Sequence, residues 1–249
     1  MRVIRDIEYA AHGPQTSLDF YLAGGPGPLY VYFHDGGFIA GDKEDASAGL
    51  ELLARQGISC ISANYRLWRK GGSEQEPFFY GDAAAVVAWA ARGAPQYGCT
   101  GPLYIGGSSA GAALAMMLCF ARPLLEEQGV SAAAVAGWVF DAGQPTTHYE
   151  LLARRGLDRR RVMVDETAPL YHLAGGPDAA QAAQRFLFVL AERDIPGRAE
   201  QNALLRATML ALGYAPGQLA WRTMQGQAHV GYLGSEGYWQ QVAEFLLGR

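Results

Sequence analysis

Short hydrophobic runs recur along the chain, and segments of helical character separate them. Strands buried on both faces of a parallel sheet are hydrophobic almost throughout, and six runs fit this pattern: Leu29–His34, Ile58–Asn64, Leu103–Gly106, Val135–Asp141, Phe186–Glu192 and Leu219–Met224. The helical stretches are Asp45–Gln56, Gly81–Tyr97, Gly111–Glu127, Glu200–Leu212 and Gly237–Leu247. Alternating strands and helices predict an α/β fold whose doubly wound sheet carries helices on both faces.

Two earlier segments have a different pattern. Arg2–Tyr9 and Ser17–Leu22 alternate hydrophobic and polar residues more regularly than the later runs do. Such alternation is typical of strands with one solvated face, so we predict an exposed antiparallel pair at the edge of the sheet. Together with the six hydrophobic runs, this pair gives a mostly parallel sheet of about eight strands.

A single domain over residues 1–249 suits a chain of this length and pattern. One segment, 142–181, interrupts the regular alternation of strands and helices. A connection of this length is usually functional or carries structure of its own, and this one mixes short amphipathic pieces with prolines. We predict a small helical cap over the functional site; a decorated surface crossover is the alternative.

Composition narrows the class of protein. Half of the residues are hydrophobic and 18% are charged, which favours a compact folded chain. The net charge of −4 and the lack of a dense basic block argue against a nucleic-acid partner. Two groups of arginines, 154–155 and 159–161, share their stretch with Asp158, Asp165 and Glu166, so we interpret them as a solvated helix face.

Three cysteines, Cys60, Cys99 and Cys119, lack the spacing of a metal or redox site, and we expect neither a metal nor another cofactor. The charged N-terminus has no signal-like hydrophobic region, and no hydrophobic stretch reaches the ~20 residues that span a bilayer. The expectation is a cytoplasmic protein without a membrane partner. A homodimer remains open.

The motif Gly107-Ser108-Ser109-Ala110-Gly111 carries the candidate chemistry. It follows a short hydrophobic strand and precedes a helix rich in small residues, which is the context in which G-x-S-x-G forms a nucleophile elbow. A sharp turn there exposes the central hydroxyl, here that of Ser109. It also directs the amide of Ala110 toward the group that the hydroxyl attacks.

A nucleophilic serine needs a base and an acid that orients the base. In α/β hydrolases both follow the serine along the chain, on loops after later strands. His229 follows the last predicted strand and is the candidate base, because His148 and His172 fall in the predicted cap. Asp194 follows the preceding strand and is the candidate acid. Its competitors are Glu192, on the same strand end, and Asp141, at the end of the strand before.

An oxyanion hole needs backbone amides close to the substrate. The loop His34-Asp35-Gly36-Gly37-Phe38 directly follows a buried strand and supplies glycines at the expected place. A tight strand-to-helix turn is the structural alternative. We predict that amides of Gly36 or Gly37 act with that of Ala110.

These motifs resemble the α/β-hydrolase superfamily, in its esterase branch of hormone-sensitive-lipase-like, small feruloyl or acetyl, and kynurenine-formamidase-like enzymes. The resemblance covers most of the chain through the following matches: the 34–38 loop, Gly41-Asp42-Lys43, Asn64-Tyr65-Arg66-Leu67, Pro77, Asp82, Trp89, 106–111, Asp194 and His229. Two departures matter. Asp35 replaces the first glycine of the family loop, and only about thirty residues precede His34.

The resemblance implies a serine carboxylesterase that acts on a small ester with a short or aromatic acyl group. An arylformamidase or other amidase would use the same three residues, and a non-catalytic ligand-binding protein of this fold is a further alternative. Candidate substrate-binding residues are Phe38, Tyr65, Trp68, Ser108, Tyr171 and Tyr232. Core packing is the competing interpretation for each aromatic residue among them.

Overall fold

The computed structural model describes residues 1–73 and 76–249. Within these ranges eight strands form one sheet, in the spatial order β1-β2-β4-β3-β5-β6-β7-β8. The strands are β1 (Arg2–Glu8), β2 (Ser17–Leu22), β3 (Leu29–Phe33), β4 (Ser59–Ala63), β5 (Leu103–Ser108), β6 (Val135–Asp141), β7 (Arg185–Arg193) and β8 (Leu219–Ala228). β2 pairs antiparallel with β1 and with β4, and the other pairs are parallel. The predicted mostly parallel, eight-stranded sheet is confirmed.

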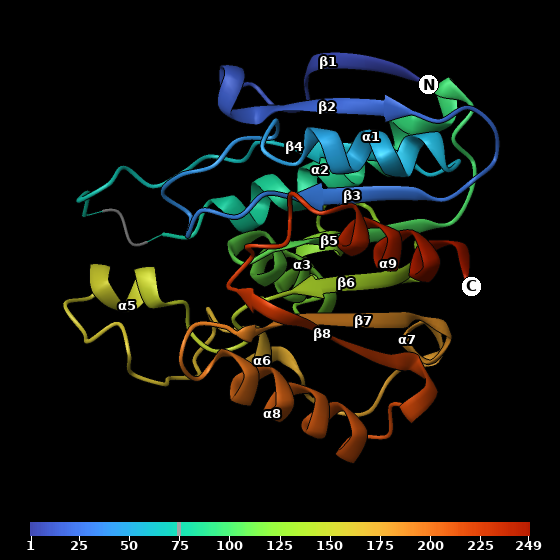
Figure 1. Cartoon of the computed structure of the whole chain (residues 1–249). Helices are drawn as coiled ribbons and strands as arrows, with labels where there is room; N and C mark the ends of the chain where they lie inside the picture. Colours follow the sequence, from blue (N-terminus) through green and yellow to red (C-terminus); the bar gives the residue numbers. More distant parts are fainter. Residues whose placement is uncertain (74–75) are drawn as a thin grey trace.

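Helices cover both faces of the sheet (Figure 1). On one face lie α1 (Ser47–Arg55) and α9 (Glu236–Leu247), and on the other lie α2 (Phe79–Gly93), α3 (Ala110–Phe120) and α8 (Arg198–Ala211). The remaining helices are short: α4 (Pro123–Glu126), α5 (Tyr149–Arg154), α6 (Pro169–His172), α7 (Ala179–Ala183), η1 (Gly13–Thr16), η2 (Ala94–Tyr97), η3 (Ala132–Ala134) and η4 (Pro216–Gln218).

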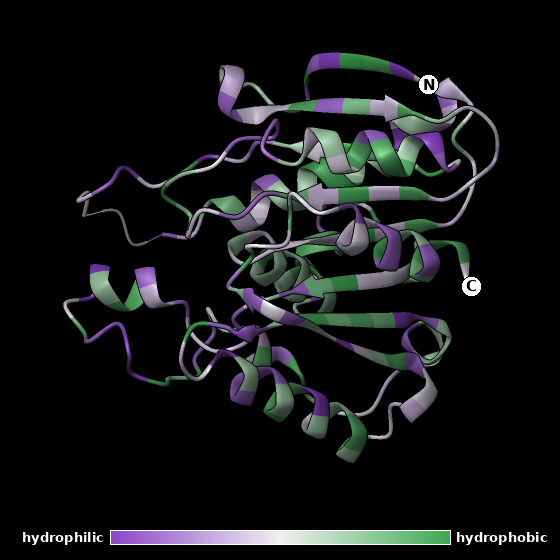
Figure 2. Cartoon of the chain, in the orientation of Figure 1, coloured by the Kyte–Doolittle hydropathy of each residue, from purple (hydrophilic) through white to green (hydrophobic). Residues whose placement is uncertain are grey.

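The hydrophobic runs form strands because successive side chains enter two different cores. In β7, Phe186 and Phe188 pack into the core on the α2, α3 and α8 side. Leu187 and Val189 point to the opposite face and pack beneath α1 and α9. A strand with both faces covered in this way must be hydrophobic throughout, and Figure 2 shows that β6 and β7 are largely so.

The structure corrects the predicted exposed edge pair. β1 is the edge strand, but every residue of β2 is buried. Its alternation of residue types does not mark a solvated face, because Leu18 and Phe20 enter one core while Tyr21 enters the other. The polar Asp19 is buried with an ion pair to Lys43, whose Nζ lies 2.8 Å from Asp19 Oδ1. In the sequence, a buried carboxylate with a cationic partner cannot be told apart from a solvent-exposed carboxylate.

Two predicted helices are each divided by a proline. The expected helix Gly81–Tyr97 becomes α2 followed by η2, which contains Pro95. The expected helix Gly111–Glu127 becomes α3 and α4, and α4 begins at Pro123. Proline has no N–H to continue a helix from the preceding turn, so both divisions follow from the sequence. Among the helices of the described ranges, none has the length and hydrophobicity needed to cross a membrane.

The parallel strands β3 to β8 end at the same edge of the sheet. Ligands of open α/β sheets bind beyond this carboxyl edge, and the loops after β3, β5, β7 and β8 carry the candidate residues. The segment 142–181 also leaves from this edge, after β6. Its first helix, α5, lies beyond the strand ends in Figure 1, whereas α6 contacts α3 and α7 contacts η3. The first part of the segment is thus the part that lies near the candidate site.

Candidate active site

Ser109 lies at the turn between β5 and α3 in a conformation that residues other than glycine rarely adopt. Its φ is +52° and its ψ is −109°. Strained conformations of this kind cost of order 1–3 kcal/mol and persist only where the surroundings hold them. The Ser109 N–H donates to the carbonyl oxygen of Asp141 at 2.7 Å, and its carbonyl accepts from the Ala113 N–H at 3.0 Å. These bonds fix the turn that carries the hydroxyl.

The two glycines of the motif are required by close packing against β3. A Cβ on Gly107 would lie 2.5 Å from the carbonyl oxygen of Phe33, and a Cβ on Gly111 would lie 2.0 Å from it. Both separations are far below ordinary van der Waals contact. The spacing G-x-S-x-G therefore reflects a turn pressed between its own helix and the neighbouring strand.

The predicted base and acid lie within hydrogen-bond distance of each other and of the serine. His229 Nε2 is 2.9 Å from Ser109 Oγ, and His229 Nδ1 is 2.6 Å from Asp194 Oδ1. Asp194 directly follows β7. His229 directly follows β8, which continues to Ala228, four residues beyond the predicted strand end at Met224. Three loops thus bring Ser109, His229 and Asp194 into one hydrogen-bonded chain.

Asp194 is held in its charged form. Burial, the largest single influence, would raise the pKa of this carboxyl, but the hydrogen bond and charge of His229 and the backbone N–H groups of Ile195 and Ala191 together lower it. The Ile195 and Ala191 N–H groups donate to the same carboxylate at 2.7 and 3.2 Å. An ionised, oriented carboxylate is what a catalytic histidine requires.

The competing acids and histidines have other partners. Glu192 Oε2 accepts from the Gly226 N–H at 2.6 Å, and Asp141 accepts from the Ser108 and Tyr232 hydroxyls. His148 caps α5 by accepting from the Glu150 N–H, and His172 Nε2 bonds the carbonyl oxygen of Glu166. Among the described residues, Asp194 is the carboxylate that bonds His229.

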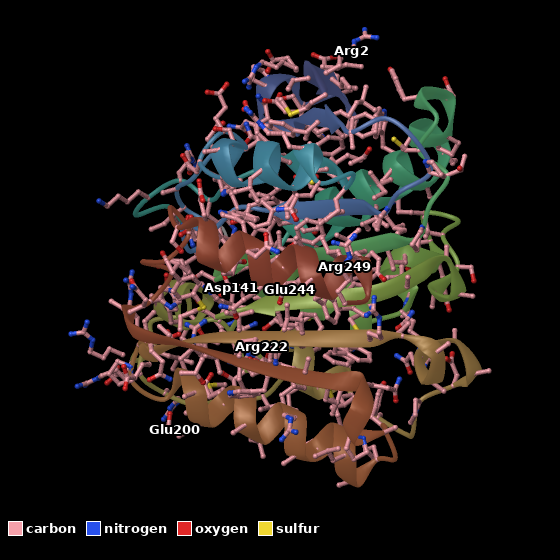
Figure 3. The ribbon with its side chains drawn as sticks, turned by 45° about the vertical axis from the view of Figure 1, so that its right-hand side comes forward. Arg2, Asp141, Glu200, Arg222, Glu244 and Arg249 are labelled. Atoms are coloured by element: carbon pink, nitrogen blue, oxygen red, sulfur yellow. The ribbon has the colours of Figure 1, made fainter. Side chains whose placement is uncertain are left out.

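Asp141 forms a buried network directly beneath the nucleophile. Its Oδ2 accepts from Ser108 Oγ at 2.6 Å, and the Tyr32 hydroxyl donates to Ser108 Oγ at 3.1 Å. Asp141 has no solvent exposure and lies in the interior in Figure 3. Burial raises the pKa of Asp141 to about 6, although the Ser108 and Tyr232 hydroxyls act in the opposite direction.

This raised pKa predicts a specific pH dependence of stability. Between about pH 4 and pH 6 the unfolded chain loses the Asp141 proton while the folded chain retains it, so this residue's contribution to stability decreases as pH rises. We expect Asp141→Asn to become more stable relative to the parent by about 2 kcal/mol from pH 4 to pH 7. Urea unfolding of both proteins at several pH values measures the difference. A difference that is constant with pH would contradict the assignment.

The loop after β3 places two glycines close to the serine turn. Gly36 has φ +106°, and a Cβ there would lie 2.0 Å from the carbonyl oxygen of Ala40. Gly37 has φ +65°, and a Cβ there would lie 2.4 Å from the Tyr149 hydroxyl. Neither of these N–H groups, nor that of Ala110, has a hydrogen-bond acceptor within residues 1–73 and 76–249. Three N–H groups on the loops after β3 and β5 are thus free to donate to a ligand.

Most of the predicted substrate-binding residues are buried, and two of them bond the loop after β3. Phe38, Tyr65, Trp68, Ser108 and Tyr232 are each at most 2% exposed. The Trp68 N–H donates to the Phe38 carbonyl at 2.8 Å, and the Tyr65 hydroxyl donates to the His34 carbonyl at 2.9 Å. The remaining candidate, Tyr171, is 56% exposed on α6. Core packing, the competing interpretation, describes the five buried residues in this structure.

A cleft of about 680 Å³ lies between α5 and the start of α8. Its lining joins Tyr149, whose hydroxyl abuts Gly37, to Ile195, which follows Asp194. The cleft therefore borders both the loop after β3 that carries Gly36 and Gly37 (the glycine loop) and the loop after β7 that carries Asp194 (the acid loop). Its other lining residues are Gln144, Arg159, Arg160, Arg161, Pro196, Gly197, Arg198 and Gln201.

Sequence reasoning missed this cleft because it assigned the arginines to a solvated helix face. Residues 159–161 are exposed, as a solvated face requires, but they are not helical: α5 ends at Arg154, and residues 159–161 lie in a turn and the chain that follows it. Gly156, with φ +72°, follows the end of the helix. The signal available in the sequence was the run of three arginines after that glycine.

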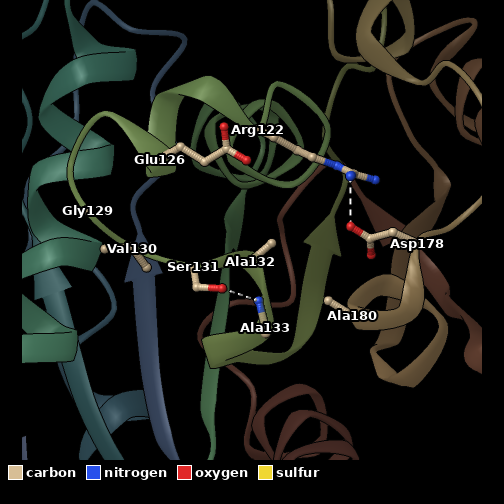
Figure 4. A pocket seen from close by; sticks show the side chains of 9 residues that line it. All are labelled: Arg122, Glu126, Gly129, Val130, Ser131, Ala132, Ala133, Asp178 and Ala180. Atoms are coloured by element: carbon tan, nitrogen blue, oxygen red, sulfur yellow. Dashed lines mark hydrogen bonds and ion pairs between the residues drawn. The ribbon is translucent and has the colours of Figure 1, made fainter.

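A different cavity, of about 390 Å³, lies beside α4, η3 and α7 (Figure 4). Arg122 Nη1 and Asp178 Oδ2 form an ion pair across it at 2.7 Å. The hydroxyl in its lining, Ser131, accepts from the Ala133 N–H at the start of η3. This cavity has no histidine in its lining, and none of Ser109, Asp194 and His229 lines it.

The chain was compared with known proteins. Carboxylic ester hydrolase LipN of Mycobacterium tuberculosis (strain ATCC 25618 / H37Rv) is 34% identical over 99 residues, which is 39% of this chain. The match covers 26% of that relative, so the chain spans about a quarter of the length of the curated relative it matches.

Solved structures share the fold over nearly the whole chain. Thermogutta terrifontis esterase 2, phosphoramylated by tabun, has a TM-score of 0.72 at 18% identity, with 98% of this chain and 91% of that chain covered. A truncated carbohydrate esterase from gut microbiota has a TM-score of 0.70 at 15% identity, with 99% and 95% covered. Esterase B from Lactobacillus rhamnosis has a TM-score of 0.66 at 17% identity, with 99% and 86% covered.

The family model described as "alpha/beta hydrolase fold" matches residues 30–230. This range begins in β3 and ends just after His229, so it includes the glycine loop, the serine turn and the acid. It also covers well over half of the chain. The protein therefore belongs to the alpha/beta hydrolase fold family.

Proposed function

We propose that this protein is a serine carboxylesterase that hydrolyses small carboxylic esters with short or aromatic acyl groups. The observation that carries the proposal is the continuous hydrogen-bonded chain from Ser109 Oγ through the His229 imidazole to the Asp194 carboxylate. The matched relative is itself named a carboxylic ester hydrolase, and the similar solved structures are named esterases.

Hydrolysis then proceeds in two steps. His229 Nε2 accepts the Ser109 proton as Oγ attacks the ester carbonyl, and Asp194 stabilises the positive imidazole that results. The imidazole returns the proton to the leaving alcohol, which leaves the acyl group on Ser109. Water, activated by the same nitrogen, attacks the acyl-enzyme and releases the acid. These steps use only protein groups and water.

The glycine loop supplies the oxyanion hole in this proposal. The carbonyl oxygen becomes negative in the tetrahedral intermediate, and the N–H of Ala110 together with those of Gly36 and Gly37 would stabilise it. Asp35, which departs from the family pattern, lies in this loop. Burial raises the pKa of the Asp35 carboxyl.

The preference for small acyl groups rests on the size of the cleft and on the similar structures. A cleft of about 680 Å³ holds a ligand of drug-like size, and Tyr149, Ile195 and Pro196 give it apolar surface. The Thermogutta terrifontis esterase is described with butyrate and with propionate bound, both of which are short carboxylic acids.

A series of 4-nitrophenyl esters from acetate to long acyl chains tests the proposal, with Ser109→Ala measured in parallel. We expect the parent to hydrolyse the short-chain esters, and 4-nitrophenyl benzoate as an aromatic ester, rapidly, and the variant to show no such turnover. If turnover in the parent does not exceed that in the variant, the esterase proposal is wrong. Parallel assays of aryl formamides then determine whether an amide is the substrate.

Because Gly37 lies against Tyr149, a second substitution at Tyr149 should partly restore the activity that a substitution at Gly37 removes. A methyl group on Gly37 would collide with the Tyr149 hydroxyl and displace an oxyanion donor, and losing one such donor costs about 10²- to 10³-fold in turnover. We expect Gly37→Ala to lower kcat/KM by at least about tenfold. Because Tyr149→Phe removes the colliding oxygen, the double variant should recover part of this loss.

Gly217→Ala is the matched control. A Cβ at Gly217 meets no atom within 4 Å, and η4 lies at the amino end of β8, away from the serine. Its kcat/KM should equal that of the parent. If the free-energy losses of Gly37→Ala and Tyr149→Phe add up to the loss of the double variant, the two residues do not interact. That result would contradict the loop geometry.

A further inference from the structure

The cleft between α5 and the start of α8 carries an excess of positive charge. Four of its lining residues are arginines and none is acidic. Two of the arginines are already paired: Arg159 Nη2 lies 3.0 Å from Glu150 Oε2, and Arg160 Nη2 lies 2.7 Å from Asp158 Oδ2. The other two, Arg161 and Arg198, form no ion pair within the described residues. Two cations are therefore left without a contacting counter-ion.

Arg198 differs from an ordinary surface arginine. It lies at the start of α8 and is 3% exposed. Its guanidinium donates to two neutral oxygens, the Ala142 carbonyl at 2.7 Å and Gln144 Oε1 at 3.3 Å. Burying a cation is costly unless it is paired or well hydrogen-bonded, and burial lowers the pKa of Arg198 while the Asp194 charge opposes that shift. A buried cation at the wall of a cleft is suited to bind an anion.

The cleft that holds these cations borders two loops of the candidate site. Arg198 follows Asp194 by four residues, and both Arg198 and Ile195 line the cleft. On the opposite wall, Tyr149 abuts Gly37 of the glycine loop. For an ester held at Ser109 to contact the arginines, one end of it must extend between Tyr149 and Ile195.

We propose that this cleft binds an anionic group of the substrate, so that the preferred esters carry a carboxylate at the end remote from the scissile bond. Guanidinium groups bind carboxylates through paired, charge-assisted hydrogen bonds. The apolar surfaces of Ile195 and Pro196 would contact the carbon chain between the two ends. This inference rests on the proposed esterase function and specifies its substrate class.

Two matched pairs of esters test the inference. For the acyl side, 4-nitrophenyl hydrogen adipate is compared with 4-nitrophenyl methyl adipate, in which the carboxylate is masked. For the alcohol side, 4-acetoxybenzoate is compared with its methyl ester. The readout is the ratio of kcat/KM for the anionic ester to that for the neutral ester. One hydrogen bond between an arginine and the substrate carboxylate should raise this ratio by about tenfold or more.

We expect the parent to prefer the anionic ester in at least one pair by about tenfold at low salt, and the preference to decrease as salt is added. Arg161→Gln should lower the ratio by about tenfold, as should Arg198→Gln. Because Arg198 also holds the start of the 142–181 segment, Arg198→Lys is included to keep a cation there, and it should retain part of the preference. Arg222→Gln, which removes a cation on β8 outside the cleft (Figure 3), is the control and should keep the parent ratio.

A ratio near one for both pairs in the parent would overturn the inference, as would a preference that Arg161→Gln and the Arg198 variants leave unchanged. Failure of the esterase proposal gives a different result, namely no Ser109-dependent hydrolysis of any of the four esters. In that case calorimetric binding of the adipate pair to Ser109→Ala decides the inference. Tighter binding of the anionic member supports it, and equal binding or no binding of the two members refutes it.

Discussion

Ser109→Ala should lower kcat for a short-chain 4-nitrophenyl ester by about 10⁴- to 10⁶-fold. The substitution removes the oxygen that attacks the ester, while the oxyanion donors and the cleft remain. The residual rate would come from those donors and from binding alone. The serine makes one side-chain hydrogen bond, to His229, so the folded state should be retained. Kinetics on purified protein, with near-ultraviolet circular dichroism as a check of folding, measure both effects.

Ser131→Ala is the control for this result. It removes a hydroxyl from η3 at the opposite edge of the sheet, where the serine caps a short helix, and its kcat should match that of the parent. Native-like Ser109→Ala protein with undiminished turnover would show that another group performs the reaction.

Asp194→Asn should lower kcat by about 10⁴-fold. The asparagine can no longer provide the charge that stabilises a protonated His229, and its amide favours the wrong tautomer of the ring. Glu192→Gln is the matched control, because Glu192 is on the same strand end but accepts its hydrogen bond from the Gly226 N–H. A glutamine oxygen can accept the same bond, so its kcat should stay within about twofold of the parent.

The reverse pattern would exchange the roles of the two carboxylates. If Glu192→Gln abolished turnover and Asp194→Asn did not, the acid would be Glu192. A large loss in both variants with cooperative unfolding preserved would point to a coupled pair, in contradiction to the separate partners seen in the structure.

Much of the fold followed from the sequence because its signals are local. Buried parallel strands need continuous hydrophobic runs, and the glycines at 107 and 111 are the residues that the turn against β3 accepts. The candidate base and acid could be placed because each directly follows a predicted strand. The strands and the order of the candidate residues depend on neighbours in the chain, which a sequence displays, and the glycine spacing is itself visible in the sequence.

Features that depend on distant partners were predicted less well. Asp19 made β2 look solvated, because the sequence does not show that Lys43 pairs with it. The aromatic residues Phe38, Tyr65 and Trp68 were candidates for substrate contact, yet they are buried beneath the glycine loop. Pockets and cores are lined by the same types of aromatic residue, and only the packing in the folded structure distinguishes the two.

The cationic cleft was the largest omission. Its charge comes from residues 159–161 and from Arg198, which are well separated in the sequence and meet only when the 142–181 segment folds back onto α8. In the sequence, the arginines at 159–161 lie close to Asp158, Asp165 and Glu166, so their charge appeared to be balanced. The structure shows which acids pair with which arginines, and therefore which cations remain.

The most direct test of the central claim is to label the protein with a fluorophosphonate and locate the adduct by mass spectrometry. A fluorophosphonate reacts with a serine only when a base activates the hydroxyl and donors stabilise the phosphoryl oxygen. We predict one stoichiometric adduct on the peptide that contains Ser109, no adduct in Ser109→Ala, and much slower labelling in His229→Ala. No labelling of the parent, or an adduct on another residue, would contradict the assignment of Ser109 as the nucleophile.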